Sequence, residues 1–253
     1  MSDHRYSAAF FRYIEPGSRR SAQRVIPVVR RLAAIDSVLD VGCGRGLWLA
    51  EWRDAGVDDI VGVDGGYVGE ALAIPKSCFI AHDLGRPFRL RRSFDLVQSL
   101  EVAEHVPAAA ADLFVDNLTA HGKTILFSAA VPGQGGEGHV NEQPYEYWRD
   151  KFAARGYGLY DACRPALKDD RAVEPWYRYN LLLFIHDDLR ARLSPALAAS
   201  QIGASAPVPR YAPFAWRLRT GILKHLPPPV VSRLARLKHR VTIAARRLGG
   251  GAR

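Results

Sequence analysis

A carboxylate followed by a cluster of glycines is the first feature of the sequence with chemical meaning. Asp40 lies in the apolar segment 38–41, and the turn that follows consists of Gly42, Cys43, Gly44, Arg45 and Gly46. Glycines let the backbone turn sharply and let a ligand approach its N–H groups closely. Asp40 would repel a pyrophosphate but suits a ligand that carries an ammonium group. The third glycine also comes one residue too early for the Gly-x-Gly-x-x-Gly turn of dinucleotide-binding folds.

Two further acidic residues stand where later strands are expected to end. Asp64 comes 18 residues after Gly46 and closes the apolar segment 60–63. A carboxylate in that place can accept hydrogen bonds from both hydroxyls of a ribose. Asp83 closes a third segment, where it could hold an adenine amino group while Leu84 packs on the ring. The pattern therefore predicts a nucleoside-binding site.

A second polar group follows the fourth expected strand and the loop after the fifth. Glu101, Glu104 and His105 come directly after the fourth strand, and His139 ends a glycine-rich loop over 133–138. Glu101 and His105 are four residues apart and would share one face of a helix. Histidine is the most common general base near neutral pH, so this group could move protons. His139, Glu142, Glu101 and His105 could in principle gather a divalent ion, but nothing in the spacing demands one and no metal site is predicted.

Strands must alternate with helices to bring both groups to one edge of a sheet. Apolar segments bounded by turn residues predict strands at 38–41, 60–63, 75–80, 94–99, 123–129, 158–162 and 179–185. Amphipathic segments predict helices at 20–34, 47–55, 108–118 and 144–155. Such alternation indicates an α/β fold, a doubly wound parallel sheet with helices on both faces. Ligands of these sheets bind at the carboxyl ends of the strands.

Charge is distributed unevenly along the 253 residues. The net charge is +9, yet residues 189–253 hold 13 Lys and Arg and no Asp or Glu, a charge of +13. Residues 1–188 hold 22 basic and 26 acidic residues, a charge of −4. No apolar stretch is long enough to span a membrane, and the N-terminus lacks an apolar secretion signal. We therefore expect a cytoplasmic protein.

A change in composition divides the chain into three expected parts. Residues 1–193 would form the α/β domain, the Ala-, Ser- and Pro-rich stretch 194–213 a linker, and residues 214–253 a basic tail. Within the tail, apolar residues recur at steps of three and four over 230–248, which indicates an amphipathic helix. The tail could be disordered, or it could lie peripherally on the inner membrane surface. Nucleic-acid binding is less favoured, because few aromatic residues interleave the basic ones.

The motifs together resemble those of class I methyltransferases that use S-adenosylmethionine (SAM). Four segments within about residues 20–186 carry the resemblance: Val38–Leu49, Gly62–Asp64, Asp83–Leu84 and Phe94–Pro107. A fifth, Phe127–Pro144, is similar to a bacterial subgroup associated with glycosyltransferases and surface-polysaccharide genes. The resemblance implies a Rossmann-like, seven-stranded, mostly parallel sheet whose last strand is antiparallel. It also implies that SAM contacts Asp40, Gly42, Cys43, Gly44, Gly46, Asp64, Asp83, Leu84 and Glu101.

The resemblance implies that the enzyme moves the methyl group of SAM to an acceptor. The sulfonium is already reactive, so the protein must align the acceptor and, for a hydroxyl, remove its proton. His139 is the first choice for that base, with His105 and Glu101 as further candidates. We expect O-methylation of a saccharide or glycan hydroxyl. The alternatives are another small molecule, an RNA or a protein as acceptor, or a SAM-binding protein without catalysis.

Overall fold

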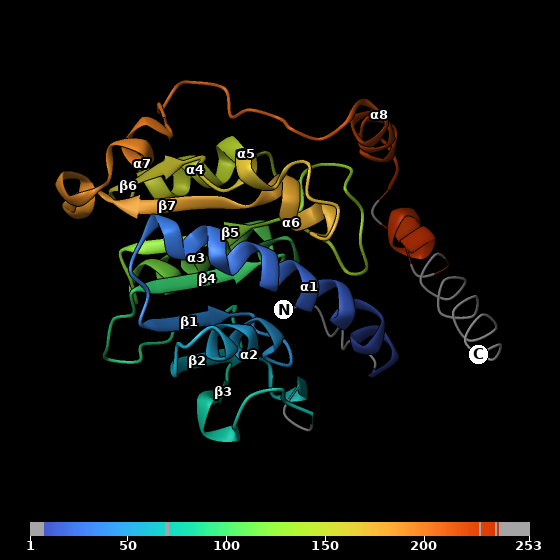
Figure 1. The fold of residues 1–253 in the computed structure, drawn as a ribbon. Coiled ribbons are helices and arrows are strands. Elements are labelled where there is room, and N and C mark those ends of the chain that lie inside the picture. The colour runs from blue at the N-terminus through green and yellow to red at the C-terminus, as the bar shows by residue number, and fades with distance from the viewer. Residues whose placement is uncertain (1–7, 69–70, 228, 236, 238–253) are drawn as a thin grey trace.

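A single mixed sheet forms the centre of the protein. The computed structural model describes residues 8–68, 71–227, 229–235 and 237, with side chains from Ile14 on. The strands are β1 Ser37–Val41, β2 Asp59–Asp64, β3 Phe79–Ala81, β4 Leu96–Leu100, β5 Thr124–Ser128, β6 Tyr157–Tyr160, β7 Leu182–His186 and β8 Gln201–Ile202. They lie in the order β3-β2-β1-β4-β5-β7-β6-β8 (Figure 1). The sheet therefore has eight strands, one more than the resemblance implied.

The strand order creates a crevice at one edge of the sheet. β1 runs parallel to both β2 and β4, and β3 and β5 extend the parallel part on either side. β7 lies antiparallel between β5 and β6, and β8 pairs antiparallel with β6. Because the order reverses between β1 and β4, the loops that follow these two strands diverge. The mostly parallel sheet and its antiparallel late strand confirm the expected fold.

Helices cover both faces of the sheet (Figure 1). Four of them pack on one face: α1 Ala8–Leu32, α2 Leu47–Asp54, α5 Arg164–Leu167 and α6 Pro175–Asn180. Two pack on the other: α3 Ala111–Thr119 and α4 Tyr145–Ala153. Two more helices follow the last long strand: α7 Pro195–Ala199 and α8 Phe214–Leu223.

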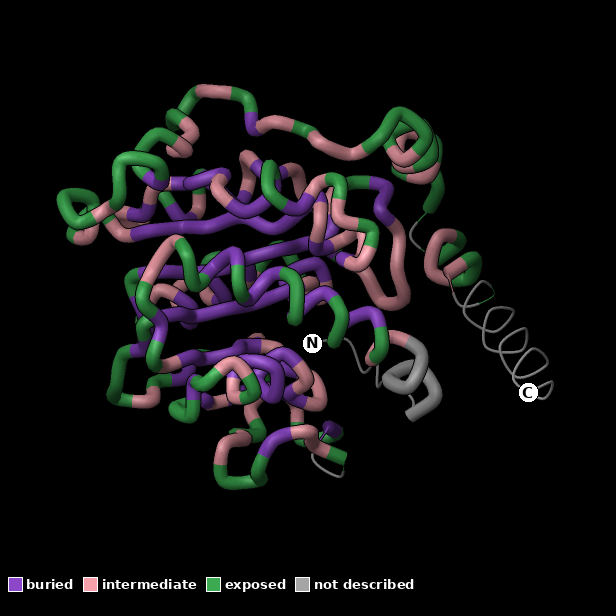
Figure 2. Tube along the Cα trace, in the orientation of Figure 1, coloured by how far each residue is buried: buried purple, intermediate pink, exposed green. Residues whose placement is uncertain are grey.

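The central strands are buried on both sides, which explains why their sequences are apolar runs. Neighbouring residues of one strand enter opposite cores: Val38 faces α1 and α2, whereas Leu39 faces α3. Leu96 and Val97 of β4 divide in the same way. Figure 2 shows these strands buried along their length. Strands of a parallel sheet that is covered on both faces do not have the polar face found in a sheet exposed to water. Continuous apolar segments therefore predicted these central strands correctly.

The first part of the strand predicted at 179–185 is helical instead. Tyr179 and Asn180 belong to α6, and β7 begins only at Leu182. Pro175 stands in the first turn of α6, where proline is favoured because its missing N–H is not needed. The hydroxyl of Tyr145 donates to the backbone carbonyl of Tyr179 (3.0 Å), which holds this turn in place. A short aromatic run cannot by itself distinguish a strand from a helical turn.

The stretch 194–213, expected to be a linker, is partly built into the domain. It contains α7 and β8, and Gln201 of β8 pairs with Tyr160 of β6. Leu197 and Val208 are 2% and 3% exposed. The N–H of Val208 donates to Oε1 of Glu146 (3.0 Å). These contacts tie residues 195–208 to the sheet and to α4.

The described part of the basic tail also packs on the protein. Arg219 of α8 donates from Nη1 to the backbone carbonyl of Gln134 (3.0 Å), in the glycine-rich loop. Helical residues 229–235 follow, and the Ser232 hydroxyl donates to the carbonyl of Gly136 (3.5 Å). Residues 238–248 of the helix predicted at 230–248 lie outside the described residues. Within the described ranges, no helix combines the length and the apolar character needed to cross a membrane.

The packing of residues 195–208 predicts a difference between two truncated chains. A chain that ends at Leu193 loses the buried side chains of Leu197 and Val208, each of which stabilises the fold by about 2 kcal/mol. We expect it to melt about 10 °C below a chain that ends at Pro213, as measured by circular dichroism. Equal melting temperatures would show that the stretch contributes nothing to the domain and behaves as a linker.

Candidate functional site

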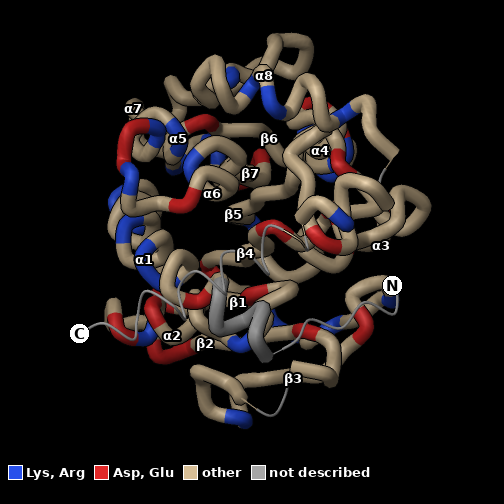
Figure 3. The backbone as a smooth tube through the Cα atoms, turned by 90° about the vertical axis from the view of Figure 1, so that its right-hand side faces the viewer, with Lys and Arg blue, Asp and Glu red and all other residues tan. Residues whose placement is uncertain are grey.

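A cavity of about 1000 Å³ opens at the carboxyl ends of the central strands. Its aspartate end is lined by Asp40, Asp64, Asp83 and Leu84. Its histidine end is lined by Glu101, Glu104, His105 and His139. Figure 3 faces this edge of the sheet and shows acidic residues gathered near the ends of β1 and β4. The fold thus brings together the two polar groups that the sequence placed on separate strands.

The turn after β1 has the left-handed backbone that its glycines favour. The φ angle is +87° at Gly42 and +52° at Gly44. A Cβ atom on Gly42 would lie 2.4 Å from Cγ2 of Val102, so a side chain does not fit there. Gly46 is the N-cap of α2 and does not line the cavity. The turn therefore brings bare backbone to the cavity wall.

Asp64 ends β2 and joins it to the glycine turn. Its Oδ2 accepts a hydrogen bond from the N–H of Gly44 (2.7 Å). Its Oδ1 accepts from the N–H of Gly65 (2.6 Å) and from the hydroxyl of Tyr67 (3.1 Å). Burial raises the pKa of Asp64, and these donors oppose the rise. The carboxylate lies on the cavity wall, where the expected ribose contact would place it.

Asp40 reaches the same end of the cavity from β1 and is 3% exposed. Burial raises the pKa of Asp40 to about 7, so its charged form is not favoured over its neutral form at neutral pH. A cationic ligand group beside this carboxyl would favour the charged form. The electrostatics of Asp40 therefore suit the ammonium-bearing ligand that the sequence predicted.

The end of β3 provides a more open wall. Oδ1 of Asp83 accepts from the N–H of Gly85 (2.9 Å), while its side chain stays 44% exposed. Leu84 beside it is buried, and Cys43 lines the cavity from the glycine turn. All the expected cofactor-binding residues except Gly46 thus line one cavity.

Glu101 departs from the expected helix over 101–105. Its φ angle of +57° is unusual for a residue other than glycine, and a short 3-10 turn, Ala103–His105, follows. The expectation that Glu101 and His105 share one helical face is therefore wrong. Glu101 instead accepts hydrogen bonds from the amides of Gln134 (2.7 Å) and Asn180 (3.4 Å). Burial raises the pKa of Glu101 to about 7.

His139 is oriented by the carboxylate of Glu142. Nδ1 of His139 lies 2.7 Å from Oε1 of Glu142. Oε1 also accepts from the N–H of Gly135, and Oε2 accepts from the N–H of Gly133 (2.8 Å each). Burial opposes ionisation, yet these hydrogen bonds hold the pKa of Glu142 below its usual value. A charged acceptor at Nδ1 places the proton on that nitrogen and leaves a lone pair on Nε2.

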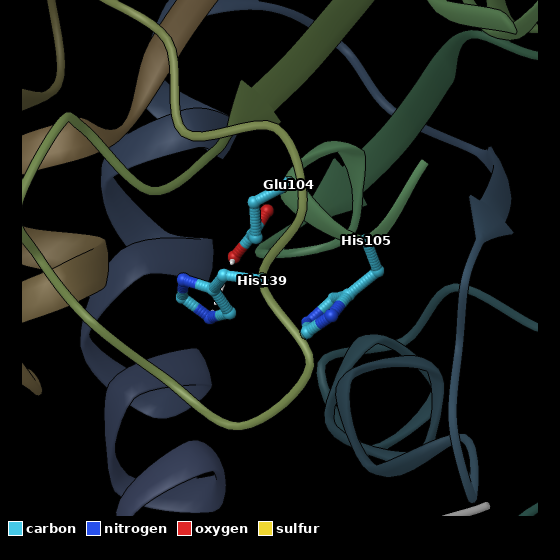
Figure 4. A group of neighbouring side chains, drawn as sticks. All are labelled: Glu104, His105 and His139. Carbon is cyan, nitrogen blue, oxygen red and sulfur yellow. Dashed lines mark ion pairs between the residues drawn. The ribbon is translucent and has the colours of Figure 1, made fainter. Parts of the chain in front are cut away.

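Glu104 lies deeper than any other member of the histidine end. Its side chain is 1% exposed, and Oε2 has no hydrogen-bond partner among the described residues. Oε1 lies 4.0 Å from Nε2 of His139 (Figure 4). Burial raises the pKa of Glu104 well above its usual range, and the nearby charge of Glu101 adds to the rise. Its position three residues after Glu101 was the only sequence signal for it.

His105 completes this group. Its ring centroid lies 5.0 Å from that of His139, and its Nδ1 lies 3.1 Å from the backbone carbonyl of Gly138. Each of these side chains offers one ligand atom, and the three atoms, from Glu104, His105 and His139, lie within 4.8 Å of one another. Two imidazoles and a carboxylate this close can relay a proton or hold a metal ion.

The basic tail forms part of the wall at the histidine end. Trp216 and Arg219 of α8, together with Ala235, line the cavity. The Trp216 ring lies 5.9 Å from the ring of Tyr179, and the Arg219 guanidinium lies 5.5 Å from the centre of the Trp216 ring. The composition predicted the tail as a separate part, because no local pattern indicates a contact between such distant segments.

The N-terminal half of the chain resembles a known protein family. A family model described as a methyltransferase domain matches residues 10–130. The matched stretch runs from α1 to β5 and contains the glycine turn, Asp64 and Glu101. No curated protein matches the chain in sequence.

Solved structures share the fold at low sequence identity. One is the sugar N-methyltransferase KedS8 from Streptoalloteichus sp ATCC 53650, which is 20% identical in sequence and superposes with a TM-score of 0.57. The match covers 74% of this chain and 95% of KedS8. A magnesium protoporphyrin IX methyltransferase from Synechocystis PCC 6803 with bound S-adenosylhomocysteine (SAH) is 18% identical with a TM-score of 0.51, covering 74% and 90%. Likeness at this level of identity establishes the fold and no more.

The family match, the fold and the cavity point to one activity. The matched residues build the parallel strands and turns that carry the cavity, and the buried aspartates there suit a cationic nucleoside ligand. The chain is therefore a SAM-dependent methyltransferase with a Rossmann-like fold.

Proposed function

We propose that the enzyme transfers the methyl group of SAM to a hydroxyl oxygen of a saccharide or glycan. The pairing of His139 with Glu142 at the histidine end carries this proposal. A hydroxyl must lose its proton as it attacks the methyl carbon. Nε2 of His139 can accept that proton, and the carboxylate of Glu142 stabilises the imidazolium that results.

The proposed reaction is an in-line displacement at the methyl carbon. The acceptor oxygen forms the new bond, and the methyl–sulfur bond breaks with its electron pair on sulfur. SAH, the methyl ether and a proton on His139 are the products. Since the sulfonium is already a good electrophile, the main tasks of the protein are alignment and proton removal.

The order of groups along the cavity supports a defined pose for SAM. Asp64 would accept hydrogen bonds from the ribose hydroxyls, and Asp83 from the adenine amino group, with Leu84 against the ring. Asp40 and Glu101 would face the methionine part with its ammonium group. Asp83, Asp64, Asp40 and Glu101 come at or just after the ends of β3, β2, β1 and β4, which is the order of these strands in the sheet. This pose would direct the methyl group toward the histidine end.

Polar and aromatic groups occur together at the histidine end, which supports a saccharide acceptor. Gln134 and Asn180 are hydrogen-bonded to each other (2.7 Å), and Gln134 lines the cavity. Trp176, Tyr177 and Trp216 line the same cavity. Aromatic walls with a few placed polar groups are typical of sites that orient a small ligand. KedS8, which shares the fold, is named as a sugar N-methyltransferase.

We also propose that the basic tail rests on an anionic membrane surface on the cytoplasmic side. Phe214, Leu218 and Ile222 recur every four residues of α8 and are 71%, 53% and 59% exposed. That spacing places them on one face of the helix. Val230 and Leu234 in the following helical residues are 40% and 48% exposed.

The charge of the tail complements such a surface. No Asp or Glu occurs after Asp188, and Figure 3 shows basic residues on α8. An exposed apolar face with basic flanks is the pattern of helices that lie in the headgroup region of anionic membranes. The same helix lines the histidine end of the cavity, so a lipid-linked acceptor would meet the enzyme beside its reactive groups.

The ribose contact is tested by Asp64→Asn. A neutral amide accepts less strongly than a carboxylate, and hydrogen bonds to charged groups contribute about 1.5–3 kcal/mol each. We expect SAM affinity to fall about 100-fold in calorimetric titration. Asp59→Asn, at the exposed start of the same strand, is the matched control and should bind as the wild type does. Affinity within twofold of wild type in Asp64→Asn would remove the ribose contact from the account.

The proton acceptor is tested by His139→Gln in assays of methyl transfer from labelled SAM to sugar and lipid-linked glycan acceptors. We expect SAM affinity to remain and kcat to fall about 10²–10⁴-fold, the usual contribution of a positioned base. His225→Gln, outside the cavity wall, is the control and should leave the rate unchanged. A normal rate in His139→Gln would exclude His139 from the reaction, and transfer only to RNA or protein would exclude a saccharide acceptor.

Membrane contact is tested by Leu218→Asp combined with Ile222→Asp. Each apolar side chain contributes about 1.5–3 kcal/mol when buried, so we expect at least about tenfold weaker sedimentation with phosphatidylglycerol vesicles. Ile80→Asp, which changes an equally apolar and 38% exposed residue on β3, is the control. If the double variant and the control bind vesicles equally, the outer face of α8 is not a membrane contact.

A further inference from the structure

We infer that Glu104, His105 and His139 form a binding site for a divalent transition-metal ion at the histidine end of the cavity. One ligand atom from each residue lies within 4.8 Å of the other two. Figure 4 shows the carboxylate of Glu104 pointing toward His139, with the ring of His105 beside them. Metal–ligand bonds of about 2.0–2.2 Å would require only small side-chain movements from this arrangement.

Both histidines are held in the tautomer that a metal requires. Nδ1 of His105 faces the carbonyl of Gly138 (3.1 Å), and a carbonyl can only accept, so this nitrogen carries the proton. Nδ1 of His139 faces the carboxylate of Glu142 (2.7 Å) with the same result. Each ring therefore has its lone pair on Nε2. Metal-bound histidines almost always donate their second N–H to a carbonyl or carboxylate in this way.

Glu104 supplies an independent reason to expect a cation at this site. Its side chain is 1% exposed, and Oε2 has no hydrogen-bond partner among the residues that the structure describes. A buried carboxylate without a partner is costly unless a cation or metal ion compensates its charge. Glu101 and Glu142 add two further carboxyl groups that lie close enough to act on Glu104.

The backbone fixes the distance between the two segments that carry the ligands. The carbonyl of Glu104 accepts hydrogen bonds from the N–H groups of Val140 (2.9 Å) and Asn141 (3.0 Å). The two residues that follow His139 are thus tied to the turn that carries Glu104 and His105. A metal ion would find the donors already assembled, which limits the entropy that binding must overcome.

The donor set indicates the class of metal. Two imidazole nitrogens and one carboxylate oxygen suit Mn²⁺, Fe²⁺, Co²⁺ or Zn²⁺ better than Mg²⁺ or Ca²⁺, which prefer oxygen ligands. Three protein ligands leave coordination positions open for water or a substrate oxygen. The sequence left a site of His139, Glu142, Glu101 and His105 open without predicting it. That set did not include Glu104, because Glu104 and His139 meet only through the fold.

The site deepens the proposed function and rests on it for its role in catalysis. A bound cation would coordinate the acceptor hydroxyl and lower its pKa. The hydroxyl proton would leave to water, the oxygen would form its bond to the methyl carbon, and the methyl–sulfur bond would break with its electrons on sulfur. His139 would then position the cation instead of taking the proton itself.

Metal binding is tested on the full-length protein without any acceptor. After treatment with a chelator, the protein is titrated with Mn²⁺ and, separately, with Zn²⁺ by calorimetry. We expect one ion per chain and a higher melting temperature with the ion. Glu104→Gln should weaken binding at least about 10-fold. Because Gln has nearly the same shape as Glu, this change should leave the melting temperature of the metal-free protein nearly unchanged.

His225→Gln serves as the matched control and should bind the ion as the wild type does. Two results would overturn the site: neither ion binds, or Glu104→Gln and wild type bind equally well. An ion that binds at this site while no saccharide is methylated would keep the site and reject the proposed acceptor. Full methyl transfer after chelation would keep the proposed function and reject the metal.

Discussion

Carboxylates buried at the carboxyl ends of the parallel strands are the constraint on which the rest of the site depends. Asp40, Asp64 and Glu104 are 3%, 5% and 1% exposed. Water does not stabilise such charges, so the protein or a ligand must do so. Backbone N–H groups do so at Asp64. The balance is incomplete at all three carboxyl groups, because burial raises the pKa of each. A site of this kind favours cations, which is consistent with an ammonium and sulfonium ligand beside a metal ion.

One loop links the parts of the site that are far apart in sequence. The side-chain amide of Gln134 donates to Glu101 (2.7 Å), and the backbone carbonyl of Gln134 accepts from Arg219 of the tail (3.0 Å). Eight residues after Gln134, the carboxylate of Glu142 is hydrogen-bonded to His139 and to the N–H groups of two loop glycines. The position of α8 is therefore coupled to both the cofactor side and the acceptor side of the cavity. Such coupling would let a surface that binds the tail influence how the reacting groups are arranged.

The sequence predicted the central strands and the aspartate end well, because both depend on local patterns. Apolar runs between turns mark buried parallel strands, and the glycine turn with Asp64 beyond it has a characteristic spacing. The histidine end was predicted only as a list of residues. The left-handed backbone at Glu101 broke the expected helix, and the partners of Glu104 and His139 come from segments brought together by folding. β8 and the docking of α8 were missed for the same reason, since short elements acquire their structure from tertiary contacts.

The central claim is that the aspartate end of the cavity binds SAM. Calorimetric titration of the purified full-length protein with SAM, SAH and NADH tests it most directly. The account predicts that SAM and SAH bind with micromolar affinity at one site per chain and that NADH does not bind. Binding of NADH, or binding of neither adenosyl ligand, would contradict the account.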